Sequence, residues 1–217
     1  LGAEGQRSAA AAAGAGARPG RRRVVGVLGC MAQRAGAELC RRHPHVDFVA
    51  GPGRLGEVPA LLEAAAAGRP AGAVLDAPRG GPADPAAEAA LEALETGRDP
   101  ARPALPAQAF VRAMRGCDTF CTYCIVPFVR GPERSRAPRA IEEEVRRLVG
   151  AGRSTITLLG QAVNRYRWAA GERTVRLSDL LERLAAVPGL RRLRFLTSHP
   201  GAMTDDLLAA MRDLPAV

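Results

Sequence analysis

Three cysteines in one short segment constrain this chain more than any other feature. Cys117, Cys121 and Cys124 form a C-x3-C-x2-C pattern directly after a predicted strand over residues 109–114. Structural zinc usually takes four Cys or His ligands in paired C-x2-C knuckles, and no fourth ligand lies nearby in the sequence. Three thiolates on one loop suit three corners of a [4Fe–4S] cluster, whose fourth iron then has no protein ligand. A zinc site and unliganded cysteines are the alternatives.

The order of predicted elements indicates an α/β fold. Strands and helices alternate on both sides of a Pro/Gly/Ala-rich stretch, which is typical of parallel sheets covered by helices. We expect strands over 23–29, 46–50, 109–114, 155–159 and 190–196, and helices over 32–41, 57–66, 85–96, 141–149, 178–184 and 204–211. In the stretch between the two parts, Asp84 and Pro85 predict a helix start and Gly97 a helix end. Glu142, Glu143 and Glu144 open a helix and suit its dipole.

These elements divide the chain into four parts. The predicted parts are a low-complexity, disordered start (1–22), a partial first domain (23–67), a linker (68–107) and a partial second domain with three βα units (108–217). The chain starts at Leu1 and is expected to be a piece of a longer protein. No apolar run approaches the roughly 18 residues of a membrane span. Five cysteines without an export signal predict a reducing, cytoplasmic setting.

The net charge of +9 points towards a polyanionic partner such as nucleic acid. All 31 basic residues are arginine, however, so part of this charge reflects a composition bias, and a solvated arginine-rich surface is equally compatible with it. The basic run Arg130, Arg134, Arg136 and Arg139 follows the cysteine loop, where an RNA phosphate or a cofactor carboxylate would need neutralising. We expect Arg130, Arg134 and Arg136 to make that contact.

The cysteine segment, with two later stretches, resembles the radical-SAM methylthiotransferases, most closely the branch that modifies isopentenylated adenosine beside the anticodon of tRNA. The segments are MRGCDTFCTYCIVPFVRGPERSR at 114–136, TLLGQAVN at 157–164 and LRFLTSHP at 193–200. Residues 23–67 resemble the end of the family's N-terminal domain. The resemblance implies a flavodoxin-like first domain and half of a radical-SAM barrel.

The resemblance also assigns site residues. Cys117, Cys121 and Cys124 would hold a [4Fe–4S] cluster that binds S-adenosylmethionine, with Tyr123 near its adenine. Cys30 matches the third ligand of a second [4Fe–4S] cluster, whose other two ligands would lie upstream of Leu1, whereas Cys40 matches no motif. Gln161, Asn164, Ser198 and His199 follow predicted strand ends, the rim that carries the chemistry of βα barrels. Gln161 and Asn164 are expected to contact S-adenosylmethionine, with a role as loop caps as the alternative.

The activity implied is transfer of a methylthio group to C2 of N6-isopentenyladenosine in tRNA, with an electron donor such as a flavodoxin or ferredoxin and a monomeric parent protein. Two alternatives remain. One is a methylthiotransferase acting on an aspartate of a ribosomal protein, and the other is a non-catalytic Fe–S or zinc RNA-binding module. Because later barrel strands are absent from this sequence, we expect the chain alone to be inactive.

Overall fold

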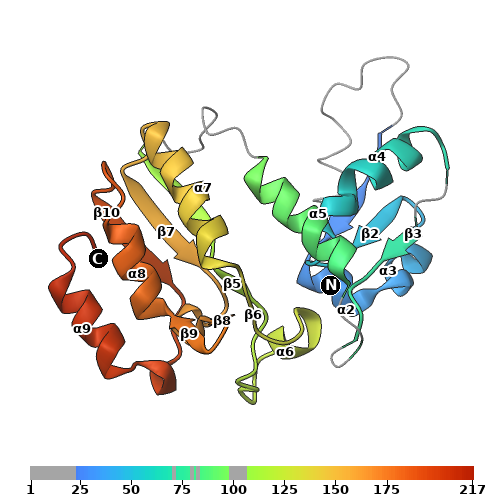
Figure 1. Ribbon diagram of the computed structural model, residues 1–217. Helices are drawn as coiled ribbons and strands as arrows, with labels where there is room; N and C mark the ends of the chain where they lie inside the picture. Colours follow the sequence, from blue (N-terminus) through green and yellow to red (C-terminus); the bar gives the residue numbers. More distant parts are fainter. Residues whose placement is uncertain (1–22, 70–71, 79–80, 82–83, 98–106) are drawn as a thin grey trace, which may run out of the picture.

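The computed structural model describes residues 23–69, 72–78, 81, 84–97 and 107–217, arranged as two parallel sheets with a helix between them (Figure 1). The first sheet has the order β1-β2-β3, with β1 (Gly26–Leu28), β2 (Phe48–Ala50) and β3 (Gly72–Val74). Its helices are α2 (Cys30–Ala35), α3 (Ala37–Arg42), the 3-10 turn η2 (Leu55–Glu57) and α4 (Val58–Ala66). The mixed α/β class with parallel sheets is therefore confirmed. The predicted disorder of residues 1–22 lies outside the described residues.

Two expectations for the first part need correction. The single helix predicted over 32–41 is two helices, because Gly36 adopts a positive φ of 57° and interrupts the backbone hydrogen bonding between α2 and α3. β3 lies inside the stretch that we expected to be a linker, but it pairs in parallel with β2, Val49 opposite Ala73. The short segment Gly-Ala-Val was not recognisable as a strand because its apolar side chains are few and small.

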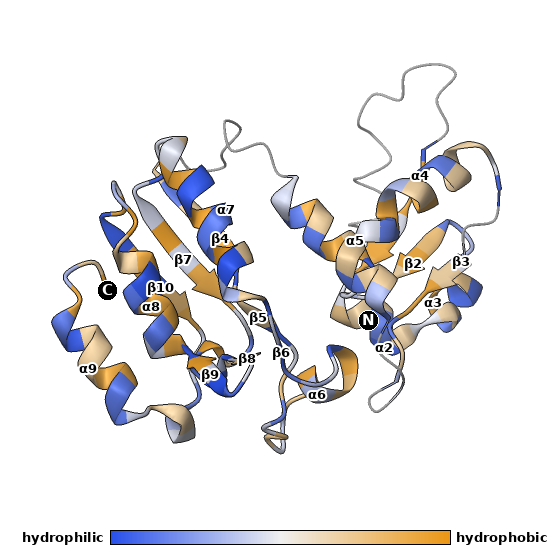
Figure 2. Cartoon of the chain, in the orientation of Figure 1, coloured by the Kyte–Doolittle hydropathy of each residue, from blue (hydrophilic) through white to orange (hydrophobic). Residues whose placement is uncertain are grey.

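The second sheet has the order β10-β7-β4, and all its pairings are parallel. Its strands are β4 (Gln108–Arg112), β7 (Thr155–Leu159) and β10 (Arg192–Leu196). Helices α7 (Pro138–Gly150), α8 (Leu177–Ala185) and α9 (Asp205–Asp213) follow the three strands in turn. Figure 2 shows apolar residues along β7 and polar residues on the outer faces of α7 and α8.

Several shorter elements lie in the segments that connect the strands and helices of the second part. They are β5 (Met114–Arg115), α6 (Val126–Val129), β6 (Arg134–Ser135), η3 (Val163–Arg165), β8 (Arg167–Ala170), β9 (Arg173–Arg176) and η4 (Pro200–Ala202). β5 pairs with β6, and β8 pairs with β9 in an antiparallel hairpin that the sequence analysis missed. α8 begins at Leu177, one residue before the expected start, and the Ser178 hydroxyl inside it donates a hydrogen bond to Asp206 Oδ2 at 2.6 Å.

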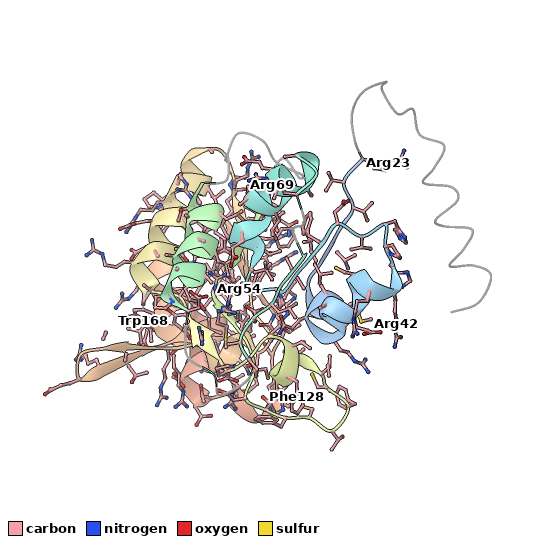
Figure 3. All side chains as sticks on the ribbon, turned by 90° about the vertical axis from the view of Figure 1, so that its right-hand side faces the viewer. Arg23, Arg42, Arg54, Arg69, Phe128 and Trp168 are labelled. Atoms are coloured by element: carbon pink, nitrogen blue, oxygen red, sulfur yellow. The ribbon has the colours of Figure 1, made fainter. Side chains whose placement is uncertain are left out.

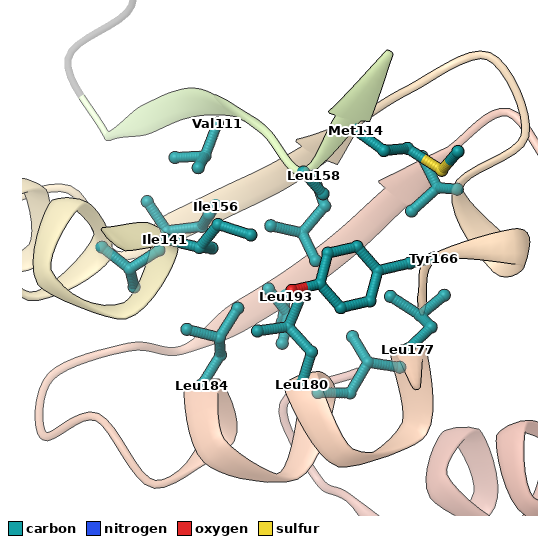
Figure 4. Close-up of a cluster of buried hydrophobic side chains, with 14 of the residues drawn as sticks. Val111, Met114, Ile141, Ile156, Leu158, Tyr166, Leu177, Leu180, Leu184 and Leu193 are labelled. Carbon is teal, nitrogen blue, oxygen red and sulfur yellow. The ribbon is translucent and has the colours of Figure 1, made fainter. Parts of the chain in front are cut away.

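The core of the second part lies between β7 and helices α7 and α8. Figure 4 shows the ring of Tyr166 among Leu158, Leu180 and Leu193, all of them buried. The Tyr166 hydroxyl donates a hydrogen bond to the carbonyl of Arg136 at 2.7 Å, and burial raises the pKa of this phenol well above its ordinary value. The hydroxyl therefore stays a donor.

Helix α5 (Pro85–Thr96) lies between the two sheets (Figure 1). Its predicted start is confirmed, since the Ala87 N–H donates to Asp84 Oδ1 at 3.0 Å and Pro85 occupies the first turn. Of the described residues, none belongs to a helix long and apolar enough to cross a membrane.

Candidate iron–sulfur site at the cysteine loop

The cysteine loop begins at a close backbone approach. Gly116 has a φ of 76°, and a Cβ on it would lie 1.9 Å from the carbonyl oxygen of Pro132, so only glycine fits. The next residue, Cys117, donates its backbone N–H to the Gly131 carbonyl at 3.1 Å. The loop is thereby anchored to the segment that leads into β6.

Charged side chains clamp the two sides of this loop. The Asp118 N–H donates to Glu133 Oε1 at 3.2 Å, and the Glu133 N–H donates to Asp118 Oδ2 at 3.3 Å. Arg165, which follows β7, donates its Nε to the same Glu133 oxygen at 2.7 Å. The cysteine loop is thus tied to the loop that follows the next strand of the sheet. The sequence analysis assigned no role to Glu133 or Arg165, which lie 32 residues apart along the chain.

The three cysteines are reduced thiols and differ in exposure. Cys117 is buried, whereas Cys121 and Cys124 are half-buried and joined by a turn in which the Cys124 N–H donates to the Cys121 carbonyl at 2.9 Å. The Cys117 thiol lies 3.3 Å from Thr119 Oγ1. Within the described ranges, no three His, Cys, Asp or Glu side chains are arranged to hold a metal ion. The structure therefore places the three cysteines on one loop without bringing their sulfur atoms together.

Three aromatic side chains lie on the cysteine loop and on α6, which follows it. Tyr123 is 90% exposed, and Phe120 and Phe128 form an edge-to-face pair with ring centroids 5.9 Å apart. Phe120 has a positive φ of 51°, which is uncommon for a bulky residue and is often found at functional sites. Phe128 projects from α6 at the lower edge of the molecule in Figure 3. An aromatic surface is thus available to a ligand next to the cysteines.

The rim residues after β7 and β10 divide into two kinds. The Asn164 side chain donates to the His199 carbonyl at 2.8 Å and accepts from the His199 N–H at 2.9 Å, so its amide joins the two loops. His199 Nδ1 in turn accepts from the Gly201 N–H at 3.2 Å. In contrast, Gln161 Oε1 is buried and has no hydrogen-bond partner among the described residues. An orphaned buried oxygen is the kind of group that a ligand satisfies.

The three arginines predicted to contact an anion have different environments. Arg130 donates its Nε to Cys30 Sγ at 3.2 Å, and Arg134 pairs with Glu88 at 2.7 Å. The expected anion contact of Arg136 needs correction, because its side chain is only 4% exposed and is paired with Glu92 and Glu144. An RNA phosphate cannot reach it without displacing these carboxylates.

Cys30 and Cys40 occupy neighbouring helices but different surroundings. Cys30 begins α2, which packs against α6, and this contact brings it to Arg130 on the segment after the cysteine loop. Cys40 lies in α3, away from this contact, and is half-buried. The structure therefore brings Cys30, but not Cys40, to the segment that follows the cysteine loop.

A charged cavity of about 50 Å³ lies between the first part and the segment after the cysteine loop. Its lining includes the aspartates Asp76 and Asp84 and four arginines, Arg54, Arg115, Arg130 and Arg134. Burial, with the charges of Arg134, Arg130 and Arg54, lowers the pKa of Arg115, whose Nε has no hydrogen-bond partner among the described residues. No sequence signal could have found this cavity, because its walls come from segments far apart in the chain.

Comparison with known proteins identifies the class of protein that carries this loop. Residues 111–217 match the model of the radical SAM superfamily, so this part of the chain is a radical SAM domain. The match begins within β4 and includes the whole cysteine loop.

Individual relatives are tRNA-2-methylthio-N(6)-dimethylallyladenosine synthases. The chain is 41% identical over 195 residues to that of Rhodopirellula baltica, which covers 90% of this chain and 41% of the relative. It is 43% identical over 192 residues to that of Bartonella tribocorum (88% and 40%) and 47% identical over 189 residues to that of Acidithiobacillus ferrooxidans (86% and 39%). The chain spans about two fifths of the length of these relatives. The resemblance to the radical-SAM methylthiotransferases is thereby confirmed.

Proposed function

We propose that this chain is part of a radical SAM transferase that adds a methylthio group to C2 of N6-isopentenyladenosine next to the anticodon of tRNA. The observation that carries the proposal is the three-cysteine loop at the carboxyl end of β4, within a chain that is 41–47% identical to synthases of that name. In a parallel sheet covered by helices, that end is where ligands bind. The electron donor is of the flavodoxin or ferredoxin kind, and the parent protein is a cytoplasmic monomer.

The residues of the loop fit the proposed cofactors in their chemistry. Three reduced thiols within eight residues are the donor set of a [4Fe–4S] cluster, and Gln161 offers an oxygen without a hydrogen-bond partner among the described residues at the same rim. Cys117, Cys121 and Cys124 would hold the cluster, and Cys30 would contribute to a second one. When bound, the cluster and S-adenosylmethionine supply the radical and methyl-transfer chemistry that no side chain can perform.

The chain's own residues bind and orient these groups. Gly116 and the Asp118–Glu133–Arg165 contacts hold the start of the loop in place, and the half-buried Cys121–Cys124 turn follows it. Tyr123 provides a ring for the adenine. Asn164 acts as a positioning residue, since its amide joins the loops after β7 and β10. Arg130 and Arg134 remain the proposed anion contacts.

The finer architecture belongs to the same proposal. The first sheet is part of a flavodoxin-like domain that extends from residue 23 to at least Val74, and the second sheet is the first three βα units of a barrel over residues 108–217. The stretch between them joins the two domains through α5. β10 is an edge strand of the described three-stranded sheet, and its Leu193 N–H donates to the carbonyl of Ala216.

Anaerobic reconstitution followed by titration with S-adenosylmethionine tests the proposal. We expect a [4Fe–4S] absorption and EPR spectrum that changes when S-adenosylmethionine is added, and methylthiolation of hypomodified tRNA by the longer parent protein. Stoichiometric zinc in place of iron would instead identify an RNA-binding module. Methylthiolation of a ribosomal-protein aspartate, with none on tRNA, would identify the other enzyme.

A further inference from the structure

Helix α5 carries three glutamates on one face. Glu88, Glu92 and Glu95 are spaced by four and three residues, so they lie one above another on the helix. The face points towards β4, β5 and β6 of the second part, and every one of the three carboxylates has an arginine partner there. A flexible linker would not be expected to carry three glutamates that each pair with an arginine of the second part.

The ion pairs form two groups, one centred on Glu88 and the other on Glu92 and Glu95. Arg112 donates its Nε to Glu95 at 2.8 Å, and Arg136 donates its Nε to Glu92 at 2.7 Å. Arg115 and Arg134 both pair with Glu88, the latter at 2.7 Å. Arg136 also pairs with Glu144 of α7, at 2.8 Å. Four arginines of the second part thus face three carboxylates of α5 and one of α7.

Burial makes this network different from surface ion pairs. The side chains of Arg136, Glu144 and Glu95 are 4%, 4% and 6% exposed. Burial acts to lower the pKa of Arg136, but its hydrogen bonds and attraction to Glu92 and Glu144 raise it overall, so it stays charged. Removing one partner would leave a buried charge uncompensated, which is strongly destabilising.

The other side of α5 packs closely against the first part. A Cβ on Gly56 of η2 would lie 2.6 Å from the Ala90 Cβ and 2.8 Å from the Ala90 carbonyl carbon, so helix and turn are in close contact. At the start of the helix, Arg54 pairs with Asp84 at 2.5 Å and with Glu57 at 3.0 Å. Helix α5 therefore contacts the second part through ion pairs, and the first part through close packing at Ala90 and an ion pair at the start of the helix.

We propose that α5 is a positioning element that fixes the first part, and with it Cys30, against the segment that follows the cysteine loop. The Arg130 to Cys30 hydrogen bond and the contact of α2 with α6 lie at the junction that α5 spans. The consequence for chemistry, a fixed separation between two cluster sites, depends on the proposed function. The fixed geometry itself does not depend on it.

Pulsed EPR between spin labels on the two parts tests the proposal without clusters or S-adenosylmethionine. Labels attached through a carbonyl-bearing unnatural amino acid at Arg41 on α3 and Arg146 on α7, both exposed, leave all native cysteines intact. The unmodified network should give one narrow distance distribution. In Glu88→Arg, which faces Arg115 and Arg134 with a third positive charge, we expect a distribution about twofold broader.

Three further variants make the result specific. Adding Arg134→Glu to Glu88→Arg restores an opposite-charge pair and should narrow the distribution again. Gly56→Ala adds a methyl group that clashes with Ala90 on the other face of α5. It should broaden the distance distribution while the ion pairs remain. Glu63→Arg on the exposed face of α4 makes the same charge change and should have no effect.

Circular dichroism of each variant separates reorientation from unfolding. Broadening with an unchanged helical signal supports the proposal, as does a loss of signal in Glu88→Arg that the added Arg134→Glu reverses. An unchanged distribution in both Glu88→Arg and Gly56→Ala, broadening in Glu63→Arg, or failure of the charge swap to restore the narrow distribution would each overturn it. None of these outcomes bears on whether the chain binds iron.

Discussion

The sheet before α5 and the sheet after it share a parallel topology but bury very different amounts of apolar side chain. The first has strands of three residues and a core built around Phe48, Ala50, Leu61 and Ala65. The second has strands of five residues and a larger core with many fully buried leucines. Because hydrophobic stabilisation scales with buried area, the second part is expected to be stable by itself, whereas the first depends more on the α5 contacts.

The largest difference that we expect concerns the cysteines of the two parts. Cys117→Ala should abolish iron loading at the loop after anaerobic reconstitution, because a cubane cluster needs three or four protein ligands. Cys40→Ala, on α3 and away from the loop, should leave iron loading unchanged. Iron and sulfide analysis of both variants provides the test, and the reverse pattern would contradict the ligand assignment.

Core truncations compare the two parts directly. Leu158→Ala removes a fully buried side chain from the large core and should cost about 3–5 kcal/mol, whereas Leu61→Ala, in the small core, should cost about 2 kcal/mol. Urea unfolding of the second part is followed by fluorescence of the single tryptophan, Trp168, and unfolding of the first part by far-UV circular dichroism. Leu62→Ala, whose side chain is 44% exposed on α4, is the matched control. Equal costs at Leu158 and Leu61 would remove the contrast between the parts.

A pair of tyrosines allows a finer test within the second part. Tyr166→Phe deletes the 2.7 Å hydrogen bond to the buried Arg136 carbonyl and should cost about 1–2 kcal/mol. Tyr123→Phe, 90% exposed, should change the free energy of unfolding by less than about 0.5 kcal/mol. Denaturant unfolding of both variants gives the comparison, and a cost at Tyr123 as large as that at Tyr166 would be unexpected.

The smallest effect that we expect is a pH dependence of the α5 contacts. Burial opposes ionisation of Glu92, but the hydrogen bond and charge of Arg136, with the charge of Arg112, lower its pKa below the ordinary 4.5. A carboxylate whose pKa is depressed on folding contributes stability above its unfolded pKa and loses it as the pH falls through the folded value. The EPR distance distribution should therefore broaden slightly as the pH falls below the ordinary glutamate pKa of 4.5. Glu92→Gln should reduce this change.

Features set by local sequence were predicted well. The C-x3-C-x2-C spacing, the Asp84 and Pro85 start of α5 and the apolar run of β7 depend on neighbouring residues, and the structure has α5 and β7 where they were expected. The interruption at Gly36 and the strand β3 were not predicted. Gly36 requires knowledge of its backbone conformation, and the residues of β3 become a strand only by pairing with β2.

The sequence by itself determined the class of the protein, because the C-x3-C-x2-C pattern that indicates it lies within eight consecutive residues. Only the tertiary structure decided which polar groups face each other. Arg136, expected at an RNA contact, is buried against Glu92 and Glu144, and Glu144, assigned to a helix dipole, is its partner. The Asn164 side chain donates a hydrogen bond to the backbone carbonyl of His199, 35 residues away. The physical reason is that burial and pairing of charges depend on segments distant in sequence, which local patterns do not encode.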